Sequence, residues 1–326
     1  MARKLFFLLA VLITALFLTG GCGNKPDTAG SVTAKADKVK VIATIYPVYE
    51  FTRQVGGDKV DVTLLIPPGS EPHDWEPTGK DLAKMKNAKL FIYNGAGIEP
   101  LDKLLHKDVI GSTVAVEVSK GIPLIKGVQK ESDHGDDHGH SHSQSHNAGA
   151  AGEEVDPHVW LDPEYAKIEV ENIATALGEM DPANKEYYRQ NASTYQAELT
   201  KLHNEFMAAL SGTIRRDIVT THAAFQYLAQ RYKLNQVPIM GLAPDAEPTP
   251  DKLASIVKFC REKQVTTIFL EPLVSPKIAQ TIAKETGAKT LVLNPVDGLT
   301  EEDLKKGRNY LSIMRENLAN LQVALR

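Results

Sequence analysis

The sequence predicts an α/β protein of two lobes, each a roughly four-stranded, mostly parallel sheet with flanking helices, joined by one long rigid helix. Short runs rich in β-branched residues alternate with segments of helical spacing in both halves of the chain, and two long helical stretches separate the halves. The strand candidates are apolar almost throughout instead of at alternate positions. Such strands are buried on both faces, which favours parallel sheets covered by helices on both sides.

Each half supplies four strand candidates and the helices that follow them. The strand candidates are 39–45, 60–66, 89–93 and 113–118 in the first half, and 217–220, 235–240, 265–270 and 289–294 in the second. The helical candidates are 46–55, 78–87 and 98–105 in the first half, and 222–232, 248–263, 275–286 and 301–325 in the second. The chain therefore repeats the alternation that builds an α/β lobe.

Two helical stretches connect the halves, the first over 163–179. The second begins at Asp181, which is expected to cap it, with Pro182 at its first position. It runs without a breaker to about Leu210, and Gly212 ends it. A helix of roughly 30 residues is about 40 to 45 Å long, which suits a strut between two lobes.

The N-terminal residues 1–21 have the pattern of a secretory signal peptide. Arg3 and Lys4 precede an almost wholly apolar run over 5–18. This run of about 14 residues is shorter than the roughly 20 residues that a membrane-spanning helix needs. We therefore expect it to direct export.

Small residues at 20–21 precede Cys22, a pattern that resembles the lipobox of bacterial lipoproteins. Cys22 is therefore expected to be lipidated, with palmitate among its acyl groups, and to tether the protein to the membrane. Thr19 departs from this pattern, in which Leu is usual, so a plain secreted protein is the alternative. Residues 22–38 are rich in small and polar residues, which indicates a flexible tether.

We expect the chain to be divided as signal peptide 1–21, lipidated cysteine and tether 22–38, N-terminal lobe 39–180, linking helix 181–211 and C-terminal lobe 212–326. The 326 residues suffice for two cores. The formal net charge of −4 offers no basic footprint for nucleic acid. The only cysteine besides Cys22 is Cys260, so no disulfide is expected once Cys22 is lipidated.

Three histidines and one aspartate are candidate metal ligands, and three of the four stand where an α/β fold places its ligands, beyond the carboxyl ends of strands. His73, His222 and Asp297 each follow a strand candidate, and His158 opens the region after the fourth strand. Two of the four come from each half, so their site would lie between the lobes. Three imidazoles and one carboxylate suit tetrahedral zinc, and also other first-row cations.

Other polar residues have more ordinary explanations. His106 and His203 lie in helical contexts and are expected to be structural. Asp156 and Asp162 flank His158, and we expect them to accept hydrogen bonds that orient a histidine ring.

Five motifs occur in the order PPGSEPHDWEPT, VDPHVWLDP, VTTHAAFQYLA, FLEPLVSPK and NPVDGLT. In this order they resemble the cluster A-I substrate-binding proteins of bacterial metal ABC transporters (solute-binding protein family 9), and most closely the zinc-specific lipoproteins among them. The resemblance covers roughly 40–326. It implies two α/β lobes joined by a long helix, and an extracytoplasmic receptor rather than an enzyme. Such a receptor captures Zn2+ and delivers it to a permease and ATPase for import.

The resemblance also implies the ligands. His73, His158 and His222 match the metal histidines of the family, and Asp297 matches the carboxylate of the second lobe. Family members differ at this fourth position.

Glu71 and Glu271 are therefore alternative ligands. The ordinary explanation for Glu271 is a loop acid that caps the helix beginning near Ser275.

The segment 127–152 is rich in His, Asp, Gly and Ser and too poor in apolar residues to bury a core, so we expect a disordered insertion. Its histidines are His134, His138, His140, His142 and His146. Zinc-specific members of the family often carry such a loop here, and manganese members generally lack it. We expect it to bind zinc weakly as an antenna, buffer or sensor; a solubilising linker is the alternative.

The expected function is thus a high-affinity zinc receptor on the extracytoplasmic side of the membrane, acting as a monomer. A manganese receptor, or one of mixed zinc and manganese specificity, is the alternative within the family. A zinc hydrolase and a surface adhesin are alternatives from other classes. The sequence holds no HExxH motif, and no catalytic residue is assigned.

Overall fold

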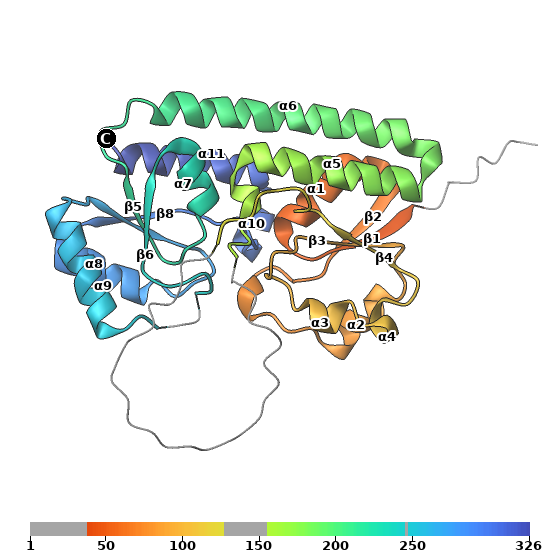
Figure 1. Cartoon of the computed structure of the whole chain (residues 1–326), viewed down its shortest axis with the longest axis horizontal. Coiled ribbons are helices and arrows are strands. Elements are labelled where there is room, and N and C mark those ends of the chain that lie inside the picture. The colour runs from red at the N-terminus through yellow and green to blue at the C-terminus, as the bar shows by residue number, and fades with distance from the viewer. Residues whose placement is uncertain (1–37, 127–154, 245–246) are drawn as a thin grey trace, which may run out of the picture. The chain divides into compact units, whose positions relative to one another are not determined.

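The computed structural model describes residues 38–126, 155–244 and 247–326, and it contains two four-stranded parallel sheets (Figure 1). The first sheet has the order β2-β1-β3-β4, with β1 at Val39–Ala43, β2 at Val60–Leu64, β3 at Leu90–Tyr93 and β4 at Val114–Glu117. The second has the order β6-β5-β7-β8, with β5 at Asp217–Thr220, β6 at Asn235–Pro238, β7 at Thr267–Leu270 and β8 at Lys289–Val292. All pairings between these strands are parallel, so the predicted fold class is confirmed.

The two sheets share one topology. In each, the chain passes from the first strand to one edge and then returns to the other side of that strand. An open α/β sheet leaves a crevice for ligands at the carboxyl ends of the two strands between which the order reverses. These strands are β1 and β3 in the first sheet and β5 and β7 in the second.

Helices cover both faces of each sheet. In the first lobe they are α1 at Tyr46–Gly56, α2 at Gly79–Met85, α3 at Leu101–Leu104, α4 at Lys107–Ile110 and α5 at Pro163–Met180. In the second they are α7 at Gln226–Tyr232, α8 at Pro250–Glu262, α9 at Lys277–Thr286, α10 at Glu301–Lys305 and α11 at Tyr310–Ala324. Neighbouring residues of a buried strand enter different cores: Ile218 joins a cluster that continues through α5, α6 and α11 into the first lobe, while Val219 packs with α8 and α9.

The long helix is α6, at Lys185–Leu210, and it contacts α1 and α5 of the first lobe and α7 and α11 of the second (Figure 1). Helical structure begins at Pro182, as predicted, with a 3-10 turn over Pro182–Asn184 that leads directly into α6. The prediction that the Asp181 side chain caps this start was wrong. Its carboxylate instead accepts hydrogen bonds from Asn184 Nδ2 (2.7 Å) and Tyr188 Oη (2.8 Å).

Two other predicted helices differ from those observed. The run 301–325 is interrupted between α10 and α11, where Gly307 has a positive φ of 63° and Asn309 caps the new helix by accepting from Ser312 N–H (2.9 Å). The helix expected from His222 begins four residues later, at Gln226. His222 therefore lies in the turn after β5 and not on a helix.

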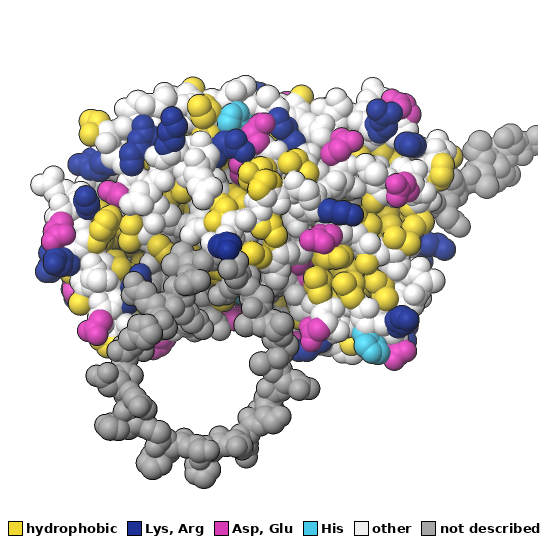
Figure 2. Space-filling model, viewed as in Figure 1, with side chains coloured by type: hydrophobic (Ala, Val, Ile, Leu, Met, Phe, Trp, Pro, Cys, Tyr) yellow, Lys and Arg dark blue, Asp and Glu magenta, His cyan; other side chains and the backbone are white. Residues whose placement is uncertain are grey.

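Several predictions concern residues outside the described part of the chain: the signal peptide, Cys22 and the histidine-rich insertion. Among the described residues, no helix is both long enough and apolar enough to cross a membrane. Cys260 is buried in α8. On the face drawn in Figure 2, Lys and Arg side chains are interspersed with Asp and Glu.

Candidate metal centre

Four side chains that the sequence singled out come together at the carboxyl ends of the strands. We call them the four-residue cluster: His73, His158, His222 and Asp297. Each offers one ligand atom, and these atoms all lie within 4.8 Å of one another. The cluster contains neither Glu71 nor Glu271.

Loops from both lobes present these side chains. His73 lies in the 3-10 turn Pro72–Asp74 that follows β2, and His158 immediately precedes α5 and its leading turn. His222 follows β5, where the second sheet has its crevice, and Asp297 lies between β8 and α10. The strand-end rule thus pointed to one location for His73, His222 and Asp297, although about 220 positions of sequence separate the first from the last. His158 joins them from the segment that leads into α5.

The ring nitrogens are spaced as zinc requires. His158 Nε2 lies 3.1 Å from His73 Nε2 and 3.3 Å from His222 Nε2. In a tetrahedral zinc site with Zn–N bonds of 2.0 to 2.1 Å, two nitrogens are about 3.3 to 3.4 Å apart. One small cation shared by the rings therefore fits these separations.

Carboxylates fix two of the rings. Asp156 Oδ1 accepts hydrogen bonds from both the backbone N–H (2.9 Å) and Nδ1 (2.8 Å) of His158. Glu271 Oε1 accepts from the backbone N–H of His222 (3.0 Å), and its Oε2 lies 2.5 Å from the His222 Nδ1. With Nδ1 donating to a carboxylate, the Nε2 atom of each ring is the one that faces the cluster.

The prediction that Asp156 orients His158 is confirmed, but the same prediction for Asp162 was wrong. The Asp162 carboxylate caps α5 by accepting from Glu164 N–H (3.0 Å) and pairs with Arg231 Nε (2.7 Å). Its position directly before a helix explains this, because an N-cap side chain is drawn to the free N–H groups of the first turn.

The suggested capping role of Glu271 was also wrong. Helix α9 begins after Pro276, with no side-chain cap. Sequence reasoning missed the contact with His222, although a signal existed. Glu271 directly follows β7 and His222 follows β5, and adjacent parallel strands bring such positions to one edge. Glu71 accepts weakly from His73 N–H (3.3 Å) and so supports the backbone of its turn.

Asp297 has an oxygen that lacks a partner within the described structure. Its side chain is 1% exposed; Oδ1 accepts from Gly298 N–H (2.7 Å), and Oδ2 makes no hydrogen bond to the described residues. Burying a carboxylate oxygen without a partner is costly. A cation held by the three imidazoles would give this oxygen its partner, so the donor set fits a metal ion.

The pKa values of the three histidine rings are shifted in different directions. Burial, reinforced by the neighbouring histidines, lowers the pKa of His73 and of His158 well below the usual value, so both rings stay neutral. Burial also acts to lower the pKa of His222, but the Glu271 carboxylate outweighs it and raises that pKa to about 9. Two facing Nε2 lone pairs repel unless they share a cation. In the metal-free protein, a proton on His222 Nε2 would be shared with His158 Nε2, which lies 3.3 Å away.

The two carboxyl groups at the site, Asp297 and Glu71, have raised pKa values. Burial raises the pKa of Asp297 to about 6. Burial and the nearby Asp297 raise the pKa of Glu71 to about 8. Near neutral pH, His222 within the cluster and Glu71 beside it therefore hold protons, and a metal ion bound at the cluster has to displace the one on His222.

Hydrogen bonds to backbone carbonyls fix the loop that carries Asp297. Tyr46 N–H donates to the Asp297 carbonyl (3.1 Å), and Trp160 Nε1 donates to the Pro295 carbonyl (2.7 Å). A Cβ atom on Gly298 would lie 3.2 Å from the Ser70 carbonyl oxygen, so the first lobe packs closely here. The carboxylate is thereby held where the three rings converge.

One side of the cluster is accessible. A pocket of about 460 Å³ is lined by His73, Ile98, Val155 and Leu242, among others. His73 is also the one member of the cluster that is not fully buried. An ion would therefore reach the cluster from this side.

Comparisons with known proteins agree with the site. The family described as "Zinc-uptake complex component A periplasmic" (ZnuA) matches residues 41–324. The chain is 42% identical over 318 residues to the "High-affinity zinc uptake system protein ZnuA" of Bacillus subtilis (strain 168), and the match covers 97% of both chains.

It is also 40% identical over 324 residues to the "Zinc-binding lipoprotein AdcA" of Streptococcus pneumoniae (strain ATCC BAA-255 / R6), covering 98% of this chain but 60% of that longer relative. The crystal structure of the Zn(II)-bound ZnuA-like domain of Streptococcus pneumoniae AdcA superposes with a TM-score of 0.72 at 38% identity, covering 89% of this chain and 99% of that one. The family expected from the five motifs is thus confirmed, and the chain belongs to the family of periplasmic zinc-uptake component A proteins, ZnuA.

Proposed function

We propose that this protein is an extracytoplasmic receptor that binds Zn2+ at the four-residue cluster and delivers it to an ABC permease and its ATPase for import. One observation carries the proposal. Three imidazole Nε2 atoms, two of them fixed by carboxylates, converge beside a buried carboxylate oxygen that lacks a partner. The names of the relatives from Bacillus subtilis and Streptococcus pneumoniae support zinc as the ion.

The same geometry favours carriage over catalysis. Three imidazoles and one carboxylate fill the four positions of tetrahedral zinc, whereas a hydrolase keeps one position open for water. A zinc-bound water that exchanges with solvent, together with turnover of an ester or peptide, would establish the hydrolase instead.

The ligand assignment is tested by calorimetry on protein lacking residues 131–147, so that the loop histidines do not contribute. Replacing His73, His158 or His222 by Ala should weaken the single tight zinc site by more than the roughly 10- to 100-fold that loss of an outer hydrogen-bond partner costs. His203→Ala is the matched control, since His203 contacts Tyr232 Oη (3.2 Å) away from the cluster. Unchanged affinity in any of the three variants removes that residue from the site.

Membrane attachment and zinc collection belong to segments outside the described residues. We assign the anchor to Cys22, supported by the word lipoprotein in the name of the pneumococcal relative. Cys22→Ser should then release the protein from the membrane fraction. We assign weak, rapidly exchanging zinc binding to the histidines of 127–152. Because no member of the four-residue cluster lies in that segment, its deletion should leave the tight site intact.

A further inference from the structure

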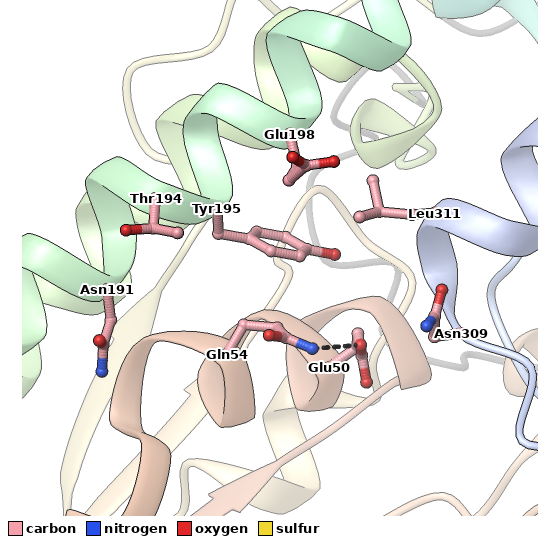
Figure 3. A pocket seen from close by; sticks show the side chains of 8 residues that line it. All are labelled: Glu50, Gln54, Asn191, Thr194, Tyr195, Glu198, Asn309 and Leu311. Atoms are coloured by element: carbon pink, nitrogen blue, oxygen red, sulfur yellow. Dashed lines mark hydrogen bonds between the residues drawn. The ribbon is translucent and has the colours of Figure 1, made fainter. Parts of the chain in front are cut away.

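A second pocket, remote from the four-residue cluster in its lining residues, lies where α1, α6 and the start of α11 meet (Figure 3). Its volume is about 300 Å³, at the lower end for small-molecule sites. Glu50 and Gln54 line it from α1, Tyr195 and Glu198 from α6, and Leu311 from α11. The pocket therefore joins helices of both lobes to the long helix.

Tyr195 leaves a buried hydroxyl unsatisfied in this pocket. The side chain is 6% exposed, and its hydroxyl makes no hydrogen bond to the described residues. Phe51 holds the ring at a centroid distance of 5.8 Å, and Figure 3 shows the hydroxyl pointing into the pocket. Burial, with Glu50 next in effect, raises the pKa of Tyr195, so the hydroxyl stays neutral. A buried hydroxyl of this kind calls for a ligand atom as its partner.

Two carboxylates stand on opposite walls. Glu50 is 5% exposed, and the hydrogen bond described for it is from Gln54 Nε2 (2.9 Å), a neutral group. Glu198 faces it across the Tyr195 ring (Figure 3). The residues described as lining the pocket include neither Lys nor Arg, so its charge is negative.

The cation described beside Glu198 does not neutralise this charge. Arg315 Nη2 lies 3.9 Å from Glu198 Oε2, but its close ion pair is with Glu205 (2.8 Å). A metal ion is a poorer match than an organic cation. Among the described residues the carboxylates of this pocket form no group with metal-ligand spacing, and Leu311 adds an apolar surface to that of the tyrosine ring.

We propose that this pocket binds a short aliphatic diamine. One ammonium group pairs with Glu50 and donates to the Tyr195 hydroxyl, the alkyl chain lies against the Tyr195 ring and Leu311, and the second ammonium pairs with Glu198. Charge-assisted hydrogen bonds to buried carboxylates are the strong ones, which favours ammonium over a neutral alcohol.

A ligand here would fasten helices that reach the metal centre. Helix α1 begins at Tyr46, whose N–H donates to the Asp297 carbonyl (3.1 Å). Helix α11 begins at Tyr310, whose hydroxyl donates to the Trp160 carbonyl (2.5 Å), two residues from His158. Diamine binding is thus expected to stabilise the contact between the lobes in the metal-free and in the zinc-loaded protein alike.

The test is a calorimetric titration of the whole mature protein with 1,4-diaminobutane at fixed ionic strength. We expect saturable binding of one molecule, weakened about tenfold or more by Glu50→Gln or Glu198→Gln and less by Tyr195→Phe. Glu186→Gln is the matched control, since it removes the same charge from an exposed position of α6 (side chain 86% exposed). Butylamine, with a single ammonium, should bind more weakly than the diamine.

Two further measurements keep the proposal open to refutation. Glu198 is half-exposed, so Glu198→Gln is not expected to disturb folding, and a thermal melt will check this. His73→Ala should leave diamine binding unchanged, which separates this pocket from the metal centre. Absence of saturable binding, or equal weakening by Glu186→Gln and Glu198→Gln, would overturn the proposal.

Discussion

Glu271 holds His222 at two points, accepting from its backbone N–H with Oε1 (3.0 Å) and contacting its ring Nδ1 with Oε2 (2.5 Å). The two residues are 49 positions apart and follow adjacent strands, β5 and β7. This double contact sets both where the ring lies and which nitrogen faces the cluster. It also supplies the negative charge that lets His222 keep a proton until a metal displaces it.

Glu271→Gln should therefore weaken zinc binding about 10- to 100-fold, the usual cost of losing the partner of a metal-binding histidine. The amide accepts through one oxygen only, so one of the two contacts is lost. Chelator competition measures the affinity. Glu262→Gln, on the exposed surface of α8, is the control and should have no effect. Wild-type affinity in Glu271→Gln would mean that packing alone orients the His222 ring.

Asp297→Asn should make the metal-free protein more stable and at the same time weaken its binding of zinc. Burial raises the pKa of Asp297 to about 6, so the ionised carboxylate is disfavoured in the metal-free fold. This group stabilises the fold most below its unfolded pKa, and that contribution is lost as the pH rises through about 6. At pH 7 the metal-free variant should therefore be more stable, by on the order of 1 kcal/mol, while zinc raises its melting temperature less than that of the wild type.

Calorimetric melts with and without zinc measure both effects for Asp297→Asn. Asp108→Asn, whose side chain is 91% exposed, is the control and should change neither. A variant that loses stability without metal yet gains as much from zinc as the wild type would show that Asp297 is a structural acid.

Zinc binding should release at least one proton at pH 7, that of His222. The pKa of His222 is raised to about 9, so its ring is protonated there, whereas His73 and His158 have lowered pKa values and are neutral. Below pH 6 Asp297 also takes up a proton, so zinc has to displace two and its affinity falls more steeply. Above pH 9 release should vanish. Titrations in buffers of different ionisation enthalpy count the protons, and no release at pH 7 would show that His222 is neutral in the metal-free protein.

The sequence predicted the fold because the central strands β1, β3, β5 and β7 are largely buried apolar runs and the helices repeat with a clear period. Local signals failed where tertiary contacts compete with them. Asp181 has the sequence position of a helix cap, but its carboxylate accepts a hydrogen bond from the Tyr188 hydroxyl instead. The run 301–325 was predicted as one helix, but it is interrupted at Gly307, which has a positive φ. Neither error affects the position of the site.

The position of the site was predictable for His73, His222 and Asp297, which follow strands, whereas His158 precedes a helix. The partners of the rings were not, since Asp156 lies two positions and Asp162 four positions from His158, and only the start of α5 decides between them. Glu271 is remote from His222 along the chain, and the pairing of β5 with β7 brings them together. Long-range pairing of this kind is set by the sheet order, which a single sequence does not display.

The choice of metal follows from the donor atoms. Three imidazoles and one carboxylate form a borderline-soft set, and the affinity of such sites rises from manganese through to copper, with zinc far above manganese. Exchange of one imidazole for a second acid would shift the preference toward manganese, but His73, His158 and His222 are all present and converge through Nε2.

We therefore expect the purified protein to carry zinc and an excess of manganese to leave it in place. Copper binds nitrogen ligands more tightly still, so its binding in vitro would not count against zinc as the physiological ion. The measurement is a competition titration on protein lacking residues 131–147, followed by metal analysis, so that only the four-residue cluster is observed. Three neutral imidazoles and one carboxylate in a tetrahedral arrangement should not prefer manganese, the harder ion. Displacement of zinc by manganese at comparable concentrations would therefore contradict this ligand set and would make the protein a manganese receptor.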